Sequence, residues 1–354
     1  MIRIGKIVIG FFSAVMLVIN TSAQTSPFND RAVVPADSSG HFRLLFGGHF
    51  HGSSFGRSGY PAATLLANLD TINALNATAL LSTGDLFLSA DKDSARYVDS
   101  FFKKLNTPLF NAPGNHDVEG KVYLRSYGPT YTSFDIGPDR VILLDTELNN
   151  GNLEGEQFAM LQDRLESFTG QNIFIVSHRP IWSENNERYA PLFAGNTRSA
   201  FSNNYMKDVY PLVKKVAGRA QVFWISGSMA GRAPASIFFQ EHEQGITFIQ
   251  SAIRDELRDA VLIADVSKLP SSSGEGEGVR PPSVKWTGLS LTGQPLEPVQ
   301  SYDAAWWKAH QGTAEPFAWR RIPYLIKKTV TNLNYWYGFG TAVLLLLLGW
   351  RIRR

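Results

Sequence analysis

The sequence has 354 residues, of which 44% are hydrophobic and 18% charged, a globular composition with enough length for one large domain or two small ones. It contains no cysteine, which excludes a disulfide framework and any thiolate metal site. Nine of the 34 basic residues lie in the two end segments, whereas all 31 acidic residues lie between them. The mildly acidic body therefore lacks the basic footprint of a nucleic-acid-binding protein, and we expect no nucleic-acid partner.

The first 23 residues predict a secretory signal peptide. Arg3 and Lys6 precede an apolar run over residues 7–19, and small residues at 21–23 form a cleavage site before Gln24. The apolar run is too short for a bilayer core about 30 Å thick, which favours cleavage over an uncleaved anchor. We therefore expect an exported protein with a short N-terminal leader over residues 24–41.

Short apolar runs then alternate with helix-like segments from residue 42 to about residue 266. The expected strands are Phe42–Phe46, Ala79–Ser82, Leu109–Ala112, Val141–Asp145, Asn172–Ser177, Val222–Ser226, Ile246–Ser251 and Ala260–Val266. The expected helices are Ala62–Asn76, Ser94–Leu105, Gly155–Phe168 and Tyr205–Ala217. This alternation predicts an α/β layered domain. Residues 267–283, rich in Gly, Ser and Pro, predict a flexible loop, and Ser283–Leu291 predicts a strand that pairs back with Ala260–Val266, so the domain extends over residues 42–300.

The C-terminal part predicts a membrane anchor. Aromatic and basic residues over 301–331 predict a juxtamembrane segment. Residues 332–350 include five consecutive leucines and aromatic residues at both edges, and just reach the roughly 17–25 residues needed to span a bilayer. The basic tail over 351–354 is expected in the cytoplasm, which places the body on the extracytoplasmic side of the cell membrane. A sorting tail that is later removed remains an alternative.

Side chains that can bind metal ions recur directly after the expected strands. These residues are His49 and His51, Asp85, the run Asn115-His116-Asp117, and His178. A spacing of two places His49 and His51 on the same face. Because ligands bind beyond the carboxyl ends of strands in open α/β sheets, we expect these side chains to converge at one place.

Three segments here resemble motifs of the calcineurin-like metallophosphoesterases: Gly84-Asp85, Gly114-Asn115-His116-Asp117, and "VSHRP" around His178. The resemblance covers roughly residues 42–266 and implies a central β-sandwich flanked by helices. It also implies that Asp85 bridges two divalent metal ions, that Asn115 and His178 bind the second ion, and that His116 acts on the phosphate as general acid or electrostatic stabiliser. Asp117 is expected to hydrogen-bond to the site rather than bind metal. Two such ions would polarise the phosphoryl group and activate a water molecule, and imidazole and amide ligands favour Mn, Fe or Zn over Mg.

The sequence departs from this family's pattern at two places. His49-Phe50-His51 stands where the family has Asp-x-His, and Ser228 and Ala230 stand where it has the histidines of Gly-His-x-His. The first ion would keep His49, His51 and Asp85 as ligands, so one or two bound ions both remain open. Arg232, in the altered segment, is a candidate phosphate contact because arginine pairs well with phosphate.

The predicted function is that of an exported, membrane-anchored, metal-dependent phosphoesterase. The alternative is a catalytically impaired metallophosphoesterase-like domain that binds a ligand or partner in the cell envelope. The class of phosphate ester is left open, because specificity lies in loops such as Ser53–Tyr60 and Ser183–Asn204.

Overall fold

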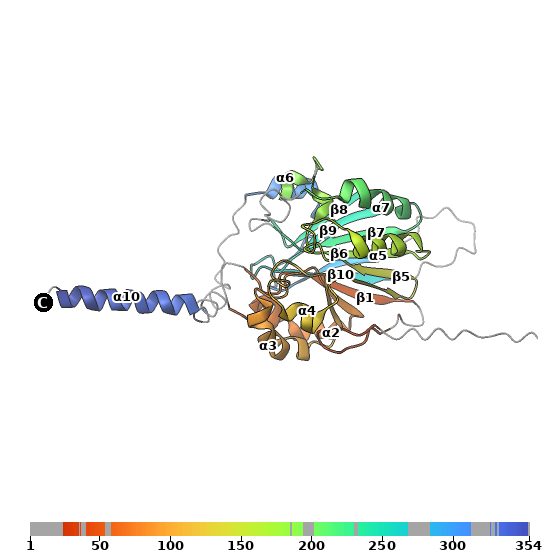
Figure 1. Ribbon diagram of the computed structural model, residues 1–354. Helices are drawn as coiled ribbons and strands as arrows, with labels where there is room; N and C mark the ends of the chain where they lie inside the picture. Colours follow the sequence, from red (N-terminus) through yellow and green to blue (C-terminus); the bar gives the residue numbers. More distant parts are fainter. Residues whose placement is uncertain are drawn as a thin grey trace, which may run out of the picture.

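The structure is a computed structural model that describes residues 24–34, 36, 40–53, 58–184, 186–193, 202–229, 233–267, 284–312, 326, 330 and 333–352. Within these residues, two β-sheets pack face to face between two sets of helices (Figure 1). Helices α2, α3 and α4 cover the outer face of one sheet, and α5 and α7 cover the other. The prediction of a mixed α/β fold with two sheets flanked by helices is confirmed.

The first sheet has the strand order β11-β10-β1-β2-β3, and the second has the order β4-β5-β6-β7-β9-β8. The strands are β1 (Phe42–Gly47), β2 (Ala79–Ser82), β3 (Leu109–Asn111), β4 (Thr132–Ile136), β5 (Asp139–Leu143), β6 (Asn172–Ser177), β7 (Gln221–Ser226), β8 (Ile237–Glu243), β9 (Ile246–Ser251), β10 (Ala260–Val266) and β11 (Val284–Ser290). The helices are α1 (Ala63–Ala67), α2 (Leu69–Ala74), α3 (Ala90–Ser100), α4 (Val122–Tyr127), α5 (Gly155–Glu166), α6 (Ala190–Phe193), α7 (Tyr210–Ala217), α8 (Ala304–His310) and α10 (Leu333–Ile352). Single turns are η1 (Phe102–Lys104), η2 (Ile181–Ser183), η3 (Tyr205–Val209) and η4 (Val299–Ser301).

Parallel pairing brings the carboxyl ends of several strands together. In the first sheet β1, β2 and β3 are parallel neighbours, and in the second β5, β6, β7 and β9 are. β11 pairs antiparallel with β10, as the sequence predicted. The segments that follow the parallel strands therefore emerge at the same end of each sheet, where the candidate ligands lie.

The arrangement of the core explains why the strands appear in the sequence as continuous apolar runs. Leu44 and Phe46 point between the sheets, where the Phe46 ring lies 5.6 Å from the ring of Trp286. Leu45, between them in sequence, packs instead with the residues under the first set of helices. Since both faces of β1 are buried, no polar alternation marks it in the sequence.

Several elements differ from the prediction. The expected helix over Ala62–Asn76 is divided at Asn68, whose side-chain amide donates to the carbonyls of Leu291 (2.7 Å) and Thr64 (2.8 Å). β4 and β8 were not predicted. Both are edge strands, and β4 mixes exposed polar residues with apolar ones, which weakens the periodic signal.

The segment expected to lie at a membrane interface begins with a helix that packs on the body. Trp307 of α8 is fully buried, and its Nε1–H donates to the carbonyl of Ile237 at 3.0 Å. Its ring lies 5.4 Å from those of Phe193 and Phe238. Part of the aromatic segment that the sequence predicted at a membrane interface therefore belongs to the hydrophobic core.

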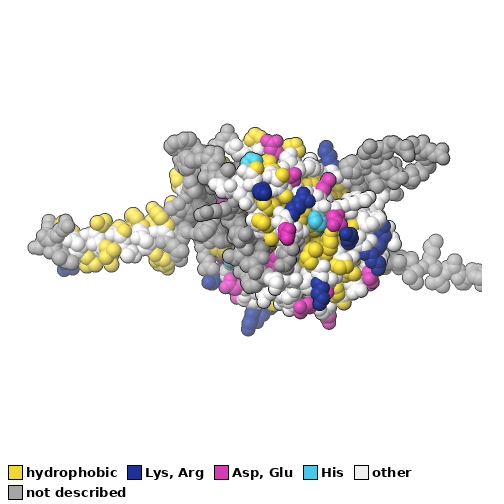
Figure 2. Space-filling view, turned by 90° about the horizontal axis from the view of Figure 1, so that it is seen from above, with side chains coloured by type: hydrophobic (Ala, Val, Ile, Leu, Met, Phe, Trp, Pro, Cys, Tyr) yellow, Lys and Arg dark blue, Asp and Glu magenta, His cyan; other side chains and the backbone are white. Residues whose placement is uncertain are grey.

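A C-terminal helix was predicted, and α10 forms there with exposed apolar side chains, visible on the extended segment in Figure 2. Across the described part of the chain, however, none of the helices has the length and apolar character that a membrane crossing demands. The predicted span over 332–350 therefore has no counterpart among the described helices. The predicted signal peptide and most of the predicted loop over 267–283 lie outside the described residues.

Candidate metal centre

Two of the candidate ligands sit in strained backbone positions at the ends of neighbouring strands. His49 follows β1 and Asp85 follows β2, and both have a positive φ, 53° and 57°. The N–H of His49 donates to the carbonyl of Gly84 at 2.8 Å, which ties the two turns together. Left-handed backbone at non-glycine residues is uncommon, and it concentrates at functional sites.

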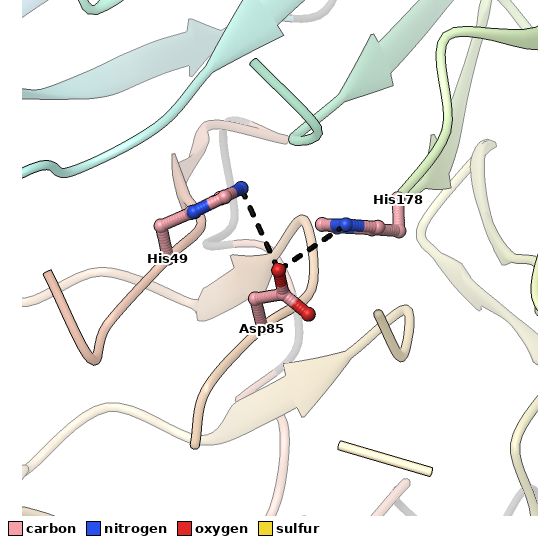
Figure 3. A group of neighbouring side chains, drawn as sticks. All are labelled: His49, Asp85 and His178. Atoms are coloured by element: carbon pink, nitrogen blue, oxygen red, sulfur yellow. Dashed lines mark ion pairs between the residues drawn. The ribbon is translucent and has the colours of Figure 1, made fainter. Parts of the chain in front are cut away.

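Three imidazoles surround one carboxylate oxygen. Oδ2 of Asp85 lies 3.4 Å from Nε2 of His178, 3.7 Å from Nε2 of His49 and 3.9 Å from Nε2 of His51. Figure 3 shows His49 and His178 converging on the same Asp85 oxygen from opposite sides. These separations exceed ordinary hydrogen-bond lengths. They approach the spacing of about 3.4 Å between ligand atoms in a tetrahedral site with bonds of about 2.1 Å.

The same nitrogen atoms lack partners within the described residues. Nε2 of His49, His51 and His178 are all buried and accept or donate no hydrogen bond there. Burying an unsatisfied polar atom costs roughly 1–3 kcal/mol, so three around one carboxylate point to a missing common partner. Divalent cations bound beside Asp85 would satisfy these nitrogen atoms, and the donor set of imidazole nitrogen and carboxylate oxygen fits Zn, Mn or Fe.

A hydrogen bond on the other ring nitrogen orients the imidazole of His178. Nδ1 of His178 lies 3.0 Å from the carbonyl of Thr83. A carbonyl oxygen only accepts, so Nδ1 carries the hydrogen and Nε2 presents its lone pair toward Asp85. His116 is held in the same way by the carbonyl of Leu88 at 3.2 Å, and its backbone N–H donates to Oδ1 of Asp85 at 3.0 Å.

The electrostatics favour neutral imidazoles beside an ionised carboxylate. Burial lowers the pKa of His49 well below its usual value, and burial also lowers the pKa of His51. Burial raises the pKa of Asp85, but its imidazole neighbours, led by His178, bring it well below its usual range. Neutral imidazole and ionised carboxylate are the protonation states in which these side chains bind metal.

The ligand atoms fall into two groups that share Asp85: one joins His49, Asp85 and His178, and the other joins His51, Asp85 and His116. Within each group the ligand atoms lie within 4.8 Å of one another. This partition differs from the predicted one, in which His49 and His51 served one ion and His178 the other. Asn115 lies half-buried in the turn before His116.

Asp117 supports the site from behind. Its buried carboxylate accepts hydrogen bonds from the backbone N–H groups of Asp85 (2.9 Å), Gly114 (2.9 Å) and Phe87 (3.1 Å), and from the amide of Asn111 (3.0 Å). Burial and the nearby charge of Asp85 raise the pKa of Asp117 to about 6. These contacts give Asp117 the supporting position expected from the sequence, and they fix the strained turn that carries Asp85.

The altered segment after β7 also packs at the site. The N–H groups of Gly227 and Ser228 donate to the carbonyl of His178 at 3.0 and 2.7 Å. Ala230 and Arg232 lie outside the described residues, so the predicted phosphate contact of Arg232 stays a prediction.

One charged residue was missed by the sequence analysis. Arg254, buried after β9, donates from Nη1 to the carbonyl of Met229 at 2.7 Å. The available signal was its position just beyond a buried parallel strand, the position that also marks the histidines.

The depressed pKa values predict a pH-dependent stability for the metal-free protein. In the unfolded chain His49 and His51 protonate near pH 6.5, whereas in the folded chain they resist protonation, so the unfolded state binds more protons below that pH. Each histidine should therefore cost up to about 1.4 kcal/mol of unfolding free energy per pH unit as the pH falls from 6.5 toward its folded pKa.

Urea unfolding measures this effect as the difference in unfolding free energy between wild type and a His49→Gln/His51→Gln variant, both in the presence of a chelator. The variant should gain stability relative to wild type between pH 6.5 and 5. The comparison with the variant is needed because Asp117, whose pKa is raised in the folded state, contributes stability as the pH falls and so opposes the effect of the histidines. A difference that stays constant with pH would contradict the assignment of neutral histidines.

No protein-family model and no curated protein matches the sequence. Among solved structures, the chain is similar to GAP50, the anchor in the inner membrane complex of Plasmodium, with 11% identity over 78% of this chain and 98% of that one, at a TM-score of 0.47. It is also similar to a dimetal phosphatase from Danio rerio, with 12% identity over 67% of this chain and 94% of that one, at a TM-score of 0.45. Within its described residues, the chain has two helix-flanked sheets and a candidate metal site of histidine and aspartate side chains.

Proposed function

We propose that this protein is a metal-dependent hydrolase of phosphate esters, with the cluster around Asp85 as its active site. The observation that carries the proposal is the set of three buried, partnerless Nε2 atoms facing one carboxylate oxygen. A purely structural cluster would pair these atoms with hydrogen-bond donors or acceptors. The sequence resemblance to metallophosphoesterases supplies the reaction class.

In this proposal His49, His51, Asp85 and His178 hold the metal, with Mn, Fe or Zn preferred over Mg, and Asn115 remains a predicted amide ligand. A bound divalent ion supplies Lewis acidity, which polarises a phosphoryl group and lowers the pKa of a water molecule. His116 is half-buried at the edge of the cluster, with Nδ1–H committed to Leu88. Its Nε2 is then the atom that accepts or returns a proton, or stabilises the developing charge of the ester.

The proposal is tested by assaying the purified protein on phosphomonoesters and phosphodiesters with added Mn²⁺ or Zn²⁺. We expect metal-dependent hydrolysis that falls by about 10²–10⁴ in His116→Ala, the usual contribution of a positioned acid or base. Hydrolysis that survives both His116→Ala and removal of the metal could not come from this cluster.

A second candidate function is a ligand-binding domain with impaired catalysis. The altered segment after β7 favours it, because Ser228 replaces a histidine of the resembled family and its N–H is bonded to the His178 carbonyl. Stoichiometric metal binding without hydrolysis of either ester class would select this candidate over the enzyme.

We also propose that the protein is exported, on the strength of the charged, apolar and small-residue segments within residues 1–23. N-terminal sequencing of protein from cells tests this. A chain that begins at Gln24 supports cleavage, and one that retains residues 1–23 contradicts it.

A further inference from the structure

The segment after β5, residues 145–151, is held in place by buried hydrogen bonds. Oδ1 of Asp145 accepts from the backbone N–H groups of Glu147 at 2.8 Å and Leu148 at 3.1 Å. The side-chain amide of Gln157, on α5, accepts from the N–H of Asp145 at 2.7 Å and donates to its carbonyl at 3.0 Å. Asp145 and Gln157 are both buried, where such bonds are stronger than in water. The backbone of Glu147 is therefore fixed relative to α5.

The side chain of Glu147 forms a bidentate ion pair with Arg179, the residue that follows His178. Nε of Arg179 donates to Oε1 of Glu147 at 2.7 Å, and Nη2 donates to Oε2 at 2.6 Å. The side chain of Arg179 is 2% exposed and that of Glu147 is 5% exposed. Two parallel hydrogen bonds between a planar guanidinium and a carboxylate fix the relative orientation of the two groups as well as their separation.

A backbone contact joins the same segment to the turn that carries His178. The N–H of Arg179 donates to Oγ1 of Thr146 at 3.0 Å, and its carbonyl accepts from Oγ of Ser177 at 3.0 Å. Nδ1 of His178 lies 3.0 Å from the carbonyl of Thr83, the bond that turns Nε2 toward Asp85. Because one peptide bond separates His178 from Arg179, a shift of the segment after β5 would move the His178 ring away from that carbonyl.

Net stability alone does not account for an ion pair at this place. The desolvation of two buried charges offsets most of their attraction, and apolar side chains of similar volume often stabilise a protein as well or better. Apolar side chains would not fix the relative orientation of the two segments, whereas a bidentate pair does. The pair between Glu147 and Arg179 thus supplies orientation, one residue away from a candidate metal ligand.

We infer that Glu147 is a positioning residue for the candidate metal centre: through Arg179 it sets the place of the His178 ring, whose Nε2 lies 3.4 Å from Oδ2 of Asp85. Residues that orient metal ligands typically change metal affinity by about 10–100-fold, and we expect Glu147 to act on this scale. The expected effect on metal affinity rests on the proposed function, whereas the effect on the position of the ring does not.

The first experiment observes the His178 ring by nuclear magnetic resonance in metal-free, full-length protein labelled with ¹⁵N-histidine. Wild type should show a slowly exchanging Nδ1–H, bonded to the Thr83 carbonyl and identified by its loss in His178→Gln. In Glu147→Gln this hydrogen should exchange about tenfold faster or more, because local opening of the turn becomes easier.

Asp135→Asn is the matched control for Glu147→Gln. Asp135 makes the same kind of bidentate pair with Arg140, at 2.7 and 2.8 Å. Arg140 lies at the start of β5, whereas Glu147 follows the end of that strand. Asp135→Asn should therefore leave both the His178 hydrogen and the metal affinity unchanged.

The second experiment compares Mn²⁺ affinity, measured by calorimetry, with the melting temperature of the metal-free protein. Glu147→Gln should bind Mn²⁺ about 10–100-fold more weakly, and it should melt at a lower temperature because the buried charge of Arg179 loses its carboxylate partner. The double variant Glu147→Gln/Arg179→Met removes both charges, so its melting temperature should recover toward that of wild type. Its Mn²⁺ affinity should stay low, because the two segments are no longer oriented by the pair. A merely structural role would restore both quantities together.

An unchanged exchange rate of the His178 hydrogen, or an unchanged Mn²⁺ affinity, in Glu147→Gln would overturn this inference and leave the proposed function intact. Recovery of Mn²⁺ affinity in the double variant would overturn it as well. Wild type that binds no Mn²⁺ would remove the proposed function, and the exchange experiment would still decide whether Glu147 positions His178. If Glu147→Gln fails to fold, the double variant and Arg179→Lys, which keeps the charge but not the bidentate geometry, decide the question by the same measurements.

Discussion

Asp85→Asn is expected to weaken metal binding by more than 100-fold and to reduce hydrolysis by about 10³-fold or more. Asp85 is the residue common to both ligand groups, and its Oδ2 is the point on which three imidazoles converge. Loss of residues that only orient ligands costs 10–100-fold in metal affinity, so loss of a shared ligand should cost more. A metal ion contributes several kcal/mol to transition-state stabilisation, which corresponds to roughly 10³-fold in rate.

Asparagine is the informative replacement at this position because it preserves both shape and backbone. Position 85 has φ 57°, a conformation that asparagine tolerates as readily as aspartate. Asp139→Asn is the matched control, since Asp139 is also a buried carboxylate but bonds the backbone and side chain of Asn172 instead. Calorimetric titration with Mn²⁺ and a phosphatase assay measure the two effects, and an Asp85→Asn protein that binds metal like wild type would sink the assignment of the site.

Gly114→Ala is expected to weaken metal binding almost as strongly as Asp85→Asn, although glycine has no side chain that could bind a metal ion. A Cβ added there would lie 2.2 Å from Oδ1 of Asp85 and 2.8 Å from its Cγ. Oδ1 accepts from the N–H of His116, so Asp85 cannot yield without breaking that bond. We expect metal affinity to fall by at least about 100-fold, because ligands displaced by ångströms no longer share one ion. Overpacking of this kind costs about 1–3 kcal/mol of stability, or roughly 3–10 °C in melting temperature.

Gly218→Ala is the control for this substitution, because a Cβ there meets only the carbonyl of Lys215 at 3.6 Å and the backbone is right-handed. It should leave metal affinity unchanged. Thermal unfolding with and without Mn²⁺ measures both variants: wild type and Gly218→Ala should be stabilised by the metal and Gly114→Ala should not. Equal stabilisation of all three would contradict the proposed geometry.

The positions of the ligands could be predicted from sequence because strand ends are easy to recognise. β1, β2, β3 and β6 are buried on both faces, and each apolar run ends in a short polar segment that carries His49, Asp85, His116 or His178. Parallel pairing brings the first three segments to one end of the first sheet, and the packing of the two sheets places the segment after β6 beside them. The edge strands β4 and β8 gave no comparable signal, since their exposed polar residues interrupt the apolar pattern.

The detailed partition of the site could not be predicted in the same way. Whether His49 shares an ion with His51 or with His178 depends on the angle between two turns and on hydrogen bonds to backbone carbonyls such as that of Thr83. Neither feature can be predicted from the residue types in the sequence. Arg254 was missed because a single arginine after a strand is usually a solvated surface residue, and its burial depends on a tertiary contact with Met229. The aromatic run around Trp307 was misread for a related reason: composition does not distinguish a core contact from a membrane interface.

The left-handed turn at His49 restricts which amino acids evolution can place there. With φ at 53°, the position tolerates glycine, asparagine, aspartate and histidine far better than branched or bulky residues. All but glycine carry an oxygen or nitrogen donor in the side chain. A change from aspartate to histidine at this turn preserves the backbone conformation and an atom that can bind a metal ion, while it removes one negative charge. The left-handed conformation thus favours substitutions by residues whose side chains can still bind the ion.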